Sequence, residues 1–152
     1  MKLATIRTDR QDGQLAVVSK DGRRAVAATG VADTLQQALE HWTSVEPALR
    51  ELAERLNSEE ITGTPFDIKA CDAPLPRAWQ WLDGSAFENH GALMQKAFDL
   101  PPIETDVPLM YQGVSDHFYS GDDDVILPSE ADGIDFEGEL CNRRSHPHGH
   151  PS

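Results

Sequence analysis

A long segment in the second half of this chain lacks positively charged side chains. Residues 97–142 contain twelve acidic side chains and no lysine or arginine, and the net charge of the whole chain is −13. Such an acidic segment argues against nucleic-acid binding and against a polybasic membrane anchor, because both need clustered positive side chains. The same run contains aromatic and aliphatic residues, which favour a folded acidic site that takes cations. The alternative is a solvated, disordered acidic surface.

The sequence also lacks features that would indicate membrane insertion, secretion or a known catalytic motif. No apolar run reaches the ~18 residues of a membrane-spanning helix, and the first residues lack the apolar segment of a signal peptide. Two cysteines, Cys71 and Cys141, do not make a disulfide framework. There is no glycine-rich phosphate loop, Cys-x-x-Cys pair or Gly-x-Ser-x-Gly elbow. We therefore expect a cytoplasmic protein with free thiols.

The N-terminal part of the sequence predicts a small α+β domain. Thr34 and Gln37 fit a capping box that opens a helix. A second helix is expected from Ser44 to Asn57, with Pro47 in its first turn, where proline is tolerated. Alternating apolar residues and glycine turns predict short strands. These strands are expected over residues 2–7, 15–19, 23–28 and 66–68.

Residues 73–78 contain two prolines and are expected to form a stiff linker. Beyond it, Asp83-Gly84 is expected to form a turn, and Ser85 with Glu88 fits a capping box for a helix over residues 86–98. Residues 109–113 are expected to be a loop or a short strand. Further strands are expected over residues 79–82, 125–127 and 133–140.

The tail, residues 141–152, has no apolar periodicity and is expected to be disordered. Its histidines His146, His148 and His150 have a spacing that would bind zinc or nickel weakly. The alternative is that the tail is a chance sequence from a shifted reading frame.

Residues 133–140 are the strongest candidate for a functional site. As a strand they place apolar residues on one face and acidic residues on the other. The apolar residues are Ile134, Phe136 and Leu140, and the acidic residues are Asp135, Glu137 and Glu139. Like charges on one face repel, and a hard divalent cation bound by oxygen ligands relieves the repulsion. Mg²⁺, Mn²⁺ or Ca²⁺ suits such a site better than zinc. The alternative is a plain exposed strand face.

Two further residues are candidates for chemistry. His90 lies within the predicted helix and would serve as a general base near neutral pH. Its alternative is a polar helix residue or a satisfied buried histidine. Tyr111 would donate a hydrogen bond to a substrate oxygen, and its alternative is packing.

Three segments, taken in order, carry a family resemblance. They are residues 80–90 (QWLDGSAFENH), 109–113 (LMYQG) and 134–140 (IDFEGEL). Together they resemble the fumarylacetoacetate hydrolase family, and most of all its bacterial members that begin with a small extra domain. Residues 1–71 resemble that extra domain too.

The resemblance implies a metal-dependent hydrolase that cleaves a carbon–carbon bond in a 1,3-diketo acid, such as fumarylacetoacetate or an acylpyruvate. Glu137 and Glu139 match the paired metal-binding glutamates of the family, and Asp83 matches an aspartate that binds the metal in some members. His90 matches the histidine that activates water, and Tyr111 matches a tyrosine that contacts the substrate. Mg²⁺ is the expected ion, with Mn²⁺ and Ca²⁺ as alternatives.

The resemblance also marks a departure. A further metal-binding aspartate, a lysine, an arginine and most of a β-rich core would follow Glu139 in the family. We therefore expect an α+β chain that is truncated within its catalytic domain and has little or no activity. Its expected parts are an N-terminal α+β domain (1–72), a linker (73–78), the incomplete start of a mixed β-rich catalytic domain (79–140) and the tail (141–152).

Partners follow from the same resemblance. A small diketo acid is the expected ligand, with no nucleic acid and no membrane. Full-length relatives are expected to be homodimers, and the oligomeric state of this chain stays open. The alternative function is a non-enzymatic interaction module that docks on a partner or on a full-length paralogue.

Overall fold

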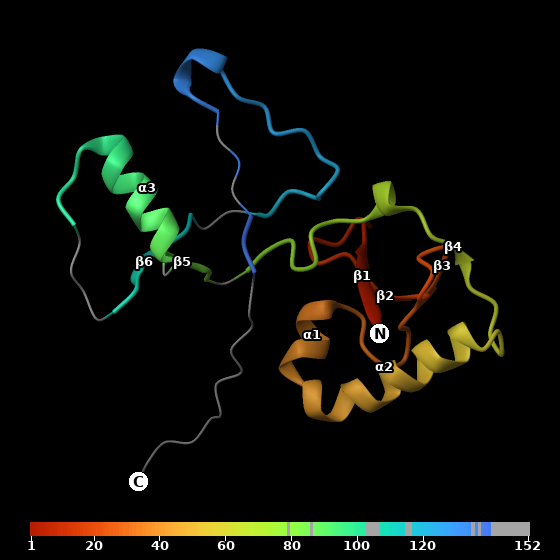
Figure 1. Ribbon diagram of the computed structural model, residues 1–152. Coiled ribbons are helices and arrows are strands. Elements are labelled where there is room, and N and C mark those ends of the chain that lie inside the picture. The colour runs from red at the N-terminus through yellow and green to blue at the C-terminus, as the bar shows by residue number, and fades with distance from the viewer. Residues whose placement is uncertain are drawn as a thin grey trace, which may run out of the picture. The chain divides into compact units, whose positions relative to one another are not determined.

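The computed structural model (Figure 1) describes residues 1–78, 80–85, 87–102, 107–114, 117–134, 136 and 138–140. The chain divides into two compact units. The N-terminal unit is Met1–Pro76 together with the chain from Phe118 onward, and the inserted unit is Arg77–His117. In the described part of the chain, none of the helices combines the length and the apolar character that a membrane crossing needs.

A four-stranded antiparallel sheet forms the centre of the N-terminal unit. Its order is β1 (Lys2–Ile6), β2 (Gln14–Val18), β3 (Arg24–Ala27) and β4 (Thr64–Pro65). The first three strands confirm the sequence prediction to within one or two residues. The strand predicted over residues 66–68 is wrong, because the short strand comes earlier and residues 68–70 turn into the 3-10 helix η1 (Ile68–Ala70). Asp67 ends the strand pairing, since its side chain caps η1 by accepting a hydrogen bond from the Lys69 N–H.

Two helices follow β3, namely α1 (Leu35–Glu40) and α2 (Trp42–Asn57). The Thr34 side chain accepts the Gln37 N–H at 3.1 Å, which confirms the predicted N-cap. The predicted start of the second helix at Ser44 is wrong. The helix begins two residues earlier because the carbonyl of His41 already accepts the N–H groups of Ser44 and Val45.

The sheet of the N-terminal unit is covered on both faces. On one face, Leu15 and Val17 of β2 pack against α1 and α2, and Figure 1 shows both helices on the same side of the strands. On the other face, Ala16 and Val18 pack with Phe66 from the segment after β4. The described residues of this core that are fully or nearly fully buried include Leu15, Ala16, Val17, Val18, Ala25, Ala28, Ala38, Leu49, Ala53 and Leu56. A strand with apolar residues on both faces is typical of a central strand, which β2 is.

The inserted unit consists of a two-stranded antiparallel sheet and one helix. Strand β5 (Leu82–Ser85) pairs with β6 (Leu109–Gln112), and α3 (Glu88–Phe98) lies between them in sequence. The short strand at residues 109–113 is confirmed. The turn predicted at Asp83-Gly84 is wrong, because both residues belong to β5 and pair with β6. The N-cap predicted at residue 85 is also wrong, because α3 begins at Glu88 and its N-cap is Phe87, without a side-chain hydrogen bond.

The chain after residue 117 has little regular structure in its described part. Its one assigned element is the 3-10 helix η2 (Glu130–Asp132). The strand predicted over residues 125–127 is wrong, since Val125, Ile126 and Leu127 are exposed and unpaired with a neighbouring strand. The strand predicted over residues 79–82 is shifted, because β5 begins only at Leu82. Trp79 lies outside the described residues.

Candidate functional site

Asp83 and Tyr111 face each other across the two-stranded sheet of the inserted unit. They are opposite residues in the β5–β6 register, so their side chains lie on the same face. The Tyr111 hydroxyl donates a hydrogen bond to Oδ2 of Asp83 at 3.0 Å. Strand pairing therefore brings together two residues that the sequence separates by 28 positions.

Trp81 supports Tyr111 from the side. The two rings meet edge to face with their centroids 6.3 Å apart, a geometry favoured between aromatic rings. The indole N–H of Trp81 donates to the carbonyl of Val114 at 3.1 Å. The ring also lies directly over Gly113, where a Cβ atom would be 1.8 Å from Cε2 of Trp81. Glycine at this position is therefore what allows the indole to reach its place.

Trp81 and Gly113 are not among the site residues predicted from the sequence. Both lie within the segments that carry the family resemblance, but neither bears a chemistry of its own that would draw attention. Their signal is the pairing of a large aromatic residue with a glycine that leaves room for it. The pairing depends on the fold. The Gly113 N–H donates a hydrogen bond to the carbonyl of Trp81, which extends the β5–β6 ladder and brings the two residues together.

His90 lies in the first turn of α3 and is half-buried. The sequence predicts a turn at Asp83-Gly84, just before the helix that carries His90. Asp83 instead sits within a strand, and its carboxylate accepts from Tyr111 rather than from His90. The structure thus places Asp83 and Tyr111 together and places His90 on the neighbouring element of the same unit.

The acidic segment does not have the form that its sequence predicts. Asp135 and Glu137 lie outside the described residues, and Glu139 is exposed. The apolar residues that were to face a core are exposed, with Ile134 at 57%, Phe136 at 92% and Leu140 at 96%. Among the described residues of 133–140 none is in a strand. The prediction of a half-buried strand is therefore wrong there, because an alternating pattern forms a strand only when a neighbour supplies hydrogen bonds and cover.

The donor chemistry of the candidate residues suits a hard cation. Carboxylate oxygens such as those of Asp83 and Glu139 are the ligands that Mg²⁺ and Ca²⁺ prefer. These two residues belong to different compact units. Within the described ranges, no group of three or more His, Cys, Asp and Glu residues is close enough to hold a metal ion. Asp83 with its Tyr111 partner is thus the assembled portion of the candidate site.

Comparison with known protein families assigns the N-terminal unit. Residues 1–77 match the family model described as fumarylacetoacetase N-terminal domain 2. The matched range contains the whole four-stranded sheet and both helices that cover it. A search of curated proteins found no match. Because the matched range spans half of the chain, the chain belongs to the fumarylacetoacetate hydrolase family, as its sequence resemblance predicts.

Proposed function

We propose that this protein acts in the metal-dependent hydrolysis of a carbon–carbon bond in a 1,3-diketo acid, such as fumarylacetoacetate or an acylpyruvate. The observation that carries the proposal is the hydrogen bond of 3.0 Å between Tyr111 and Asp83. The family resemblance assigns metal binding to Asp83 and substrate contact to Tyr111, and this hydrogen bond joins them. The family match over residues 1–77 supports the class of enzyme, and the resemblance of residues 80–90 and 109–113 supports the substrate class.

In this proposal the carboxylates of Asp83, Glu137 and Glu139 hold a divalent cation. Mg²⁺ is the proposed ion, with Mn²⁺ and Ca²⁺ as alternatives, because all the donors are oxygen atoms. Such an ion, when bound, would supply positive charge that stabilises the enolate released by cleavage of the diketone. Tyr111 orients the Asp83 carboxylate in the free protein and donates to a substrate oxygen in the complex.

His90 is the proposed base that takes a proton from the attacking water, since imidazole changes its charge near neutral pH. The resemblance also requires a lysine and an arginine that stabilise developing negative charge, and it places both after Glu139, where this sequence contains no lysine. We therefore propose that turnover by this chain alone is weak. The cytoplasm is the proposed compartment.

Metal binding is tested without any need for turnover. Paramagnetic Mn²⁺ added to ¹⁵N-labelled protein should broaden the amide signals of β5 and β6, because Asp83 and its strand partners surround the proposed ion. The broadening should disappear in Asp83→Asn and persist in Asp99→Asn, a matched variant at the end of α3. Equal broadening in Asp83→Asn would mean that Mn²⁺ binds elsewhere.

Turnover is tested with acylpyruvate and Mg²⁺, followed by loss of the diketone absorbance. We expect a slow rate that EDTA abolishes and that His90→Gln lowers about 100-fold, which is typical for loss of a general base. Glu88→Gln, two residues earlier on the same helix, should retain the rate. A rate that survives both EDTA and His90→Gln would contradict the proposed mechanism.

A second candidate function is docking on a full-length paralogue without catalysis. The observation in its favour is the amount of exposed apolar surface in the inserted unit. The exposed residues include Leu82, Phe87, Leu93, Met94, Phe98, Leu109 and Met110. Exposed apolar patches of this kind mark interaction sites in soluble proteins. Sedimentation velocity with a full-length family member would show a mixed complex that Leu93→Glu weakens, whereas the enzymatic proposal requires no such complex.

A further inference from the structure

The chain leaves the N-terminal unit at Pro76 and returns to it at Phe118. These two points meet, since the Phe118 N–H donates a hydrogen bond to the carbonyl of Pro76 at 2.7 Å. The residues between them, 77–117, are the inserted unit that carries Asp83, His90 and Tyr111. The N-terminal unit therefore includes both chain positions that flank the segment with the candidate site residues.

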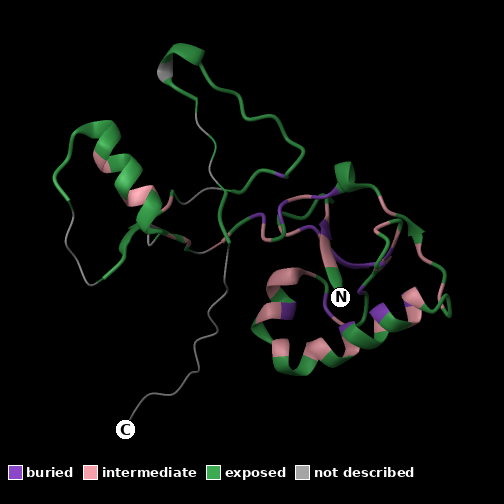
Figure 2. Ribbon diagram, viewed as in Figure 1, coloured by how far each residue is buried: buried purple, intermediate pink, exposed green. Residues whose placement is uncertain are grey.

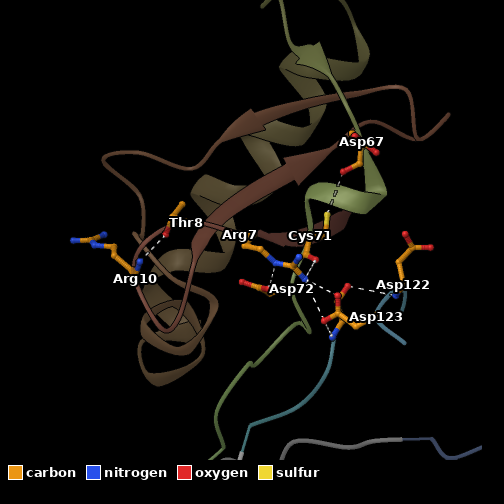
Figure 3. Close-up of polar contacts among 9 residues, drawn as sticks. Arg7, Thr8, Arg10, Asp67, Cys71, Asp72, Asp122 and Asp123 are labelled. Carbon is orange, nitrogen blue, oxygen red and sulfur yellow. Dashed lines mark hydrogen bonds and ion pairs between the residues drawn. The ribbon is translucent and has the colours of Figure 1, made fainter. Parts of the chain in front are cut away.

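Arg7 binds the returning chain through charged hydrogen bonds. Arg7, which follows β1, donates through Nε to Oδ1 of Asp72 at 2.7 Å. Its Nη2 donates to both carboxylate oxygens of Asp123, at 3.0 and 3.2 Å, and to the carbonyl of Cys71 at 3.4 Å. Figure 3 shows the guanidinium of Arg7 between the two carboxylates. The planar, always charged guanidinium suits this role, because its several N–H groups bind two acids at once.

The returning chain is shaped so that it presents Asp123 to Arg7. Residues 120–123 form a tight turn in which the Asp123 N–H donates to the carbonyl of Ser120 at 3.1 Å. In the opposite direction, the Ser120 N–H donates to Oδ2 of Asp123 at 3.0 Å. Ser120 is also buried, with 7% of its surface exposed, whereas the residues around it are exposed. The turn is thus anchored by a buried residue as well as by charge.

We infer that Arg7, Asp72 and the turn at residues 120–123 form a clasp that holds together the two chain ends of the inserted unit. Closing a long loop costs conformational entropy, and a contact at its base offsets that cost. The clasp fixes the separation of Pro76 and Phe118, the two positions between which the site-bearing segment runs. This inference concerns the fold of the chain and holds whether or not the proposed hydrolysis occurs.

A second ion pair, made by Arg10 in the loop after β1, shows why Arg7 is distinct. Arg10 lies 3.7 Å from Asp33, and both side chains are about 60% exposed, at 61% and 60%. Arg7 and Asp72 are less exposed, at 46% and 21%, and Arg7 makes several charged hydrogen bonds instead of one long contact. Isolated exposed pairs contribute little to stability, whereas networks with bidentate geometry contribute more. Arg10→Gln is therefore the matched control for Arg7→Gln.

Amide hydrogen exchange at Phe118 and Ser120 tests the clasp. Asp123→Asn removes the charge but keeps one oxygen for the Ser120 N–H, and we expect about a five-fold faster exchange at both amides, in line with the loss of a charged surface network. Arg7→Gln and Asp123→Ala should exchange faster still, and Arg10→Gln should match the wild type. The double variant Arg7→Gln/Asp123→Asn should exchange no faster than Arg7→Gln alone, because the two residues act through one contact.

Two measurements decide the result. The amide of Val17 in β2 must stay protected in every variant, which shows that the sheet is intact, and if Arg7→Gln disturbs it, Asp123→Asn decides. Mass spectrometry of limited trypsin digests should find faster cleavage after Arg77, at the base of the inserted unit, when the clasp is broken. Unchanged exchange at Phe118 and Ser120 in Asp123→Asn, or an equal change in Arg10→Gln, would overturn the inference.

Discussion

The two units of this chain build the same kinds of elements but bury them very differently. All the residues of β2 are buried except Gln14, which is half-buried, whereas all four residues of β6 are exposed. Likewise α2 buries Leu49, Ala53 and Leu56, whereas no described residue of α3 is buried. Figure 2 shows this contrast as buried residues within the N-terminal unit and largely exposed ribbon in the inserted one.

The difference lies in what covers each element. β2 has a strand on either side, two helices on one face and Phe66 on the other. β6 has β5 as its single partner strand among the described residues. A two-stranded sheet with little cover is marginally stable by itself. The N-terminal unit is therefore expected to contribute most of the stability, and the inserted unit depends on contacts at its ends.

The largest change in the free energy of unfolding is expected when a buried leucine of α2 is truncated. Leu49 of α2 is 0% exposed and Leu93 of α3 is 59% exposed. Leu49→Ala should lower the free energy of unfolding by about 2–5 kcal/mol, because it leaves a cavity in a packed core. Leu93→Ala should change it by less than about 0.5 kcal/mol. Urea unfolding followed by tryptophan fluorescence measures both, and a comparable loss in Leu93→Ala would show that α3 is covered in solution.

Alanine substitutions at two glycines should change stability in opposite directions. Gly13 has a φ of +56°, and a Cβ there would be 2.5 Å from the carbonyl oxygen of Ile6. Gly13→Ala should therefore destabilise the N-terminal unit by about 1–3 kcal/mol. Gly91 lies within α3 and faces open space, so Gly91→Ala should stabilise that helix by about 0.5–1 kcal/mol.

Thermal unfolding and circular dichroism at 222 nm separate the two glycine effects. Gly13→Ala should lower the midpoint of the main transition, whereas Gly91→Ala should raise the helical signal with little change in that midpoint. A loss of helical signal in Gly91→Ala would indicate that a neighbour occupies the space beside this residue.

The smallest effect is a pH dependence at Cys71. Burial is the main cause that raises the pKa of this thiol, and the nearby carboxylates of Asp67 and Asp72 add to it. Since the unfolded thiol ionises first, the native state loses stability as the pH rises above the ordinary thiol value of about 8.5. Cys71→Ala should lose less stability over the same alkaline range, as urea unfolding at several pH values would show.

Thiol alkylation extends this comparison to the inserted unit. In a Cys141→Ser background, Cys71 should react slowly with iodoacetamide, because it is buried and its thiolate is disfavoured. A cysteine introduced by Leu93→Cys in a Cys71→Ala/Cys141→Ser background should react at the rate of a free thiol. Equal rates at the two positions would remove the contrast in burial between the units.

Local sequence signals predicted the N-terminal unit well. Alternating apolar residues located β1 to β3, and Thr34 located the start of α1, because caps and periodicity act over a few residues. In the inserted unit the same signals located α3 and β6 but misassigned residues 83–84, and beyond this unit they failed. Asp83-Gly84 has the composition of a turn, yet pairing with β6 draws both residues into a strand. Residues 125–127 have the composition of a strand, yet no neighbour pairs with them in the described structure.

The candidate site was likewise predicted only in part from the sequence. The sequence named Asp83, His90, Tyr111, Glu137 and Glu139 through the order of three motifs, but it did not show which of them meet. Contact between Tyr111 and Asp83 depends on the β5–β6 register, and the place of Trp81 depends on the open space at Gly113. The functional roles of all five residues stay predictions.

The sequence by itself determined the family, the α+β class of the N-terminal unit and the acidic character of residues 97–142. These properties depend on composition, motif order and short-range periodicity, which are complete in the linear chain. Tertiary structure alone decided that β2 is buried on both faces, that Tyr111 reaches Asp83, and that Arg7 binds an aspartate 116 residues away. The physical reason is that a contact between distant residues depends on the strand pairing and the cover that the whole fold supplies.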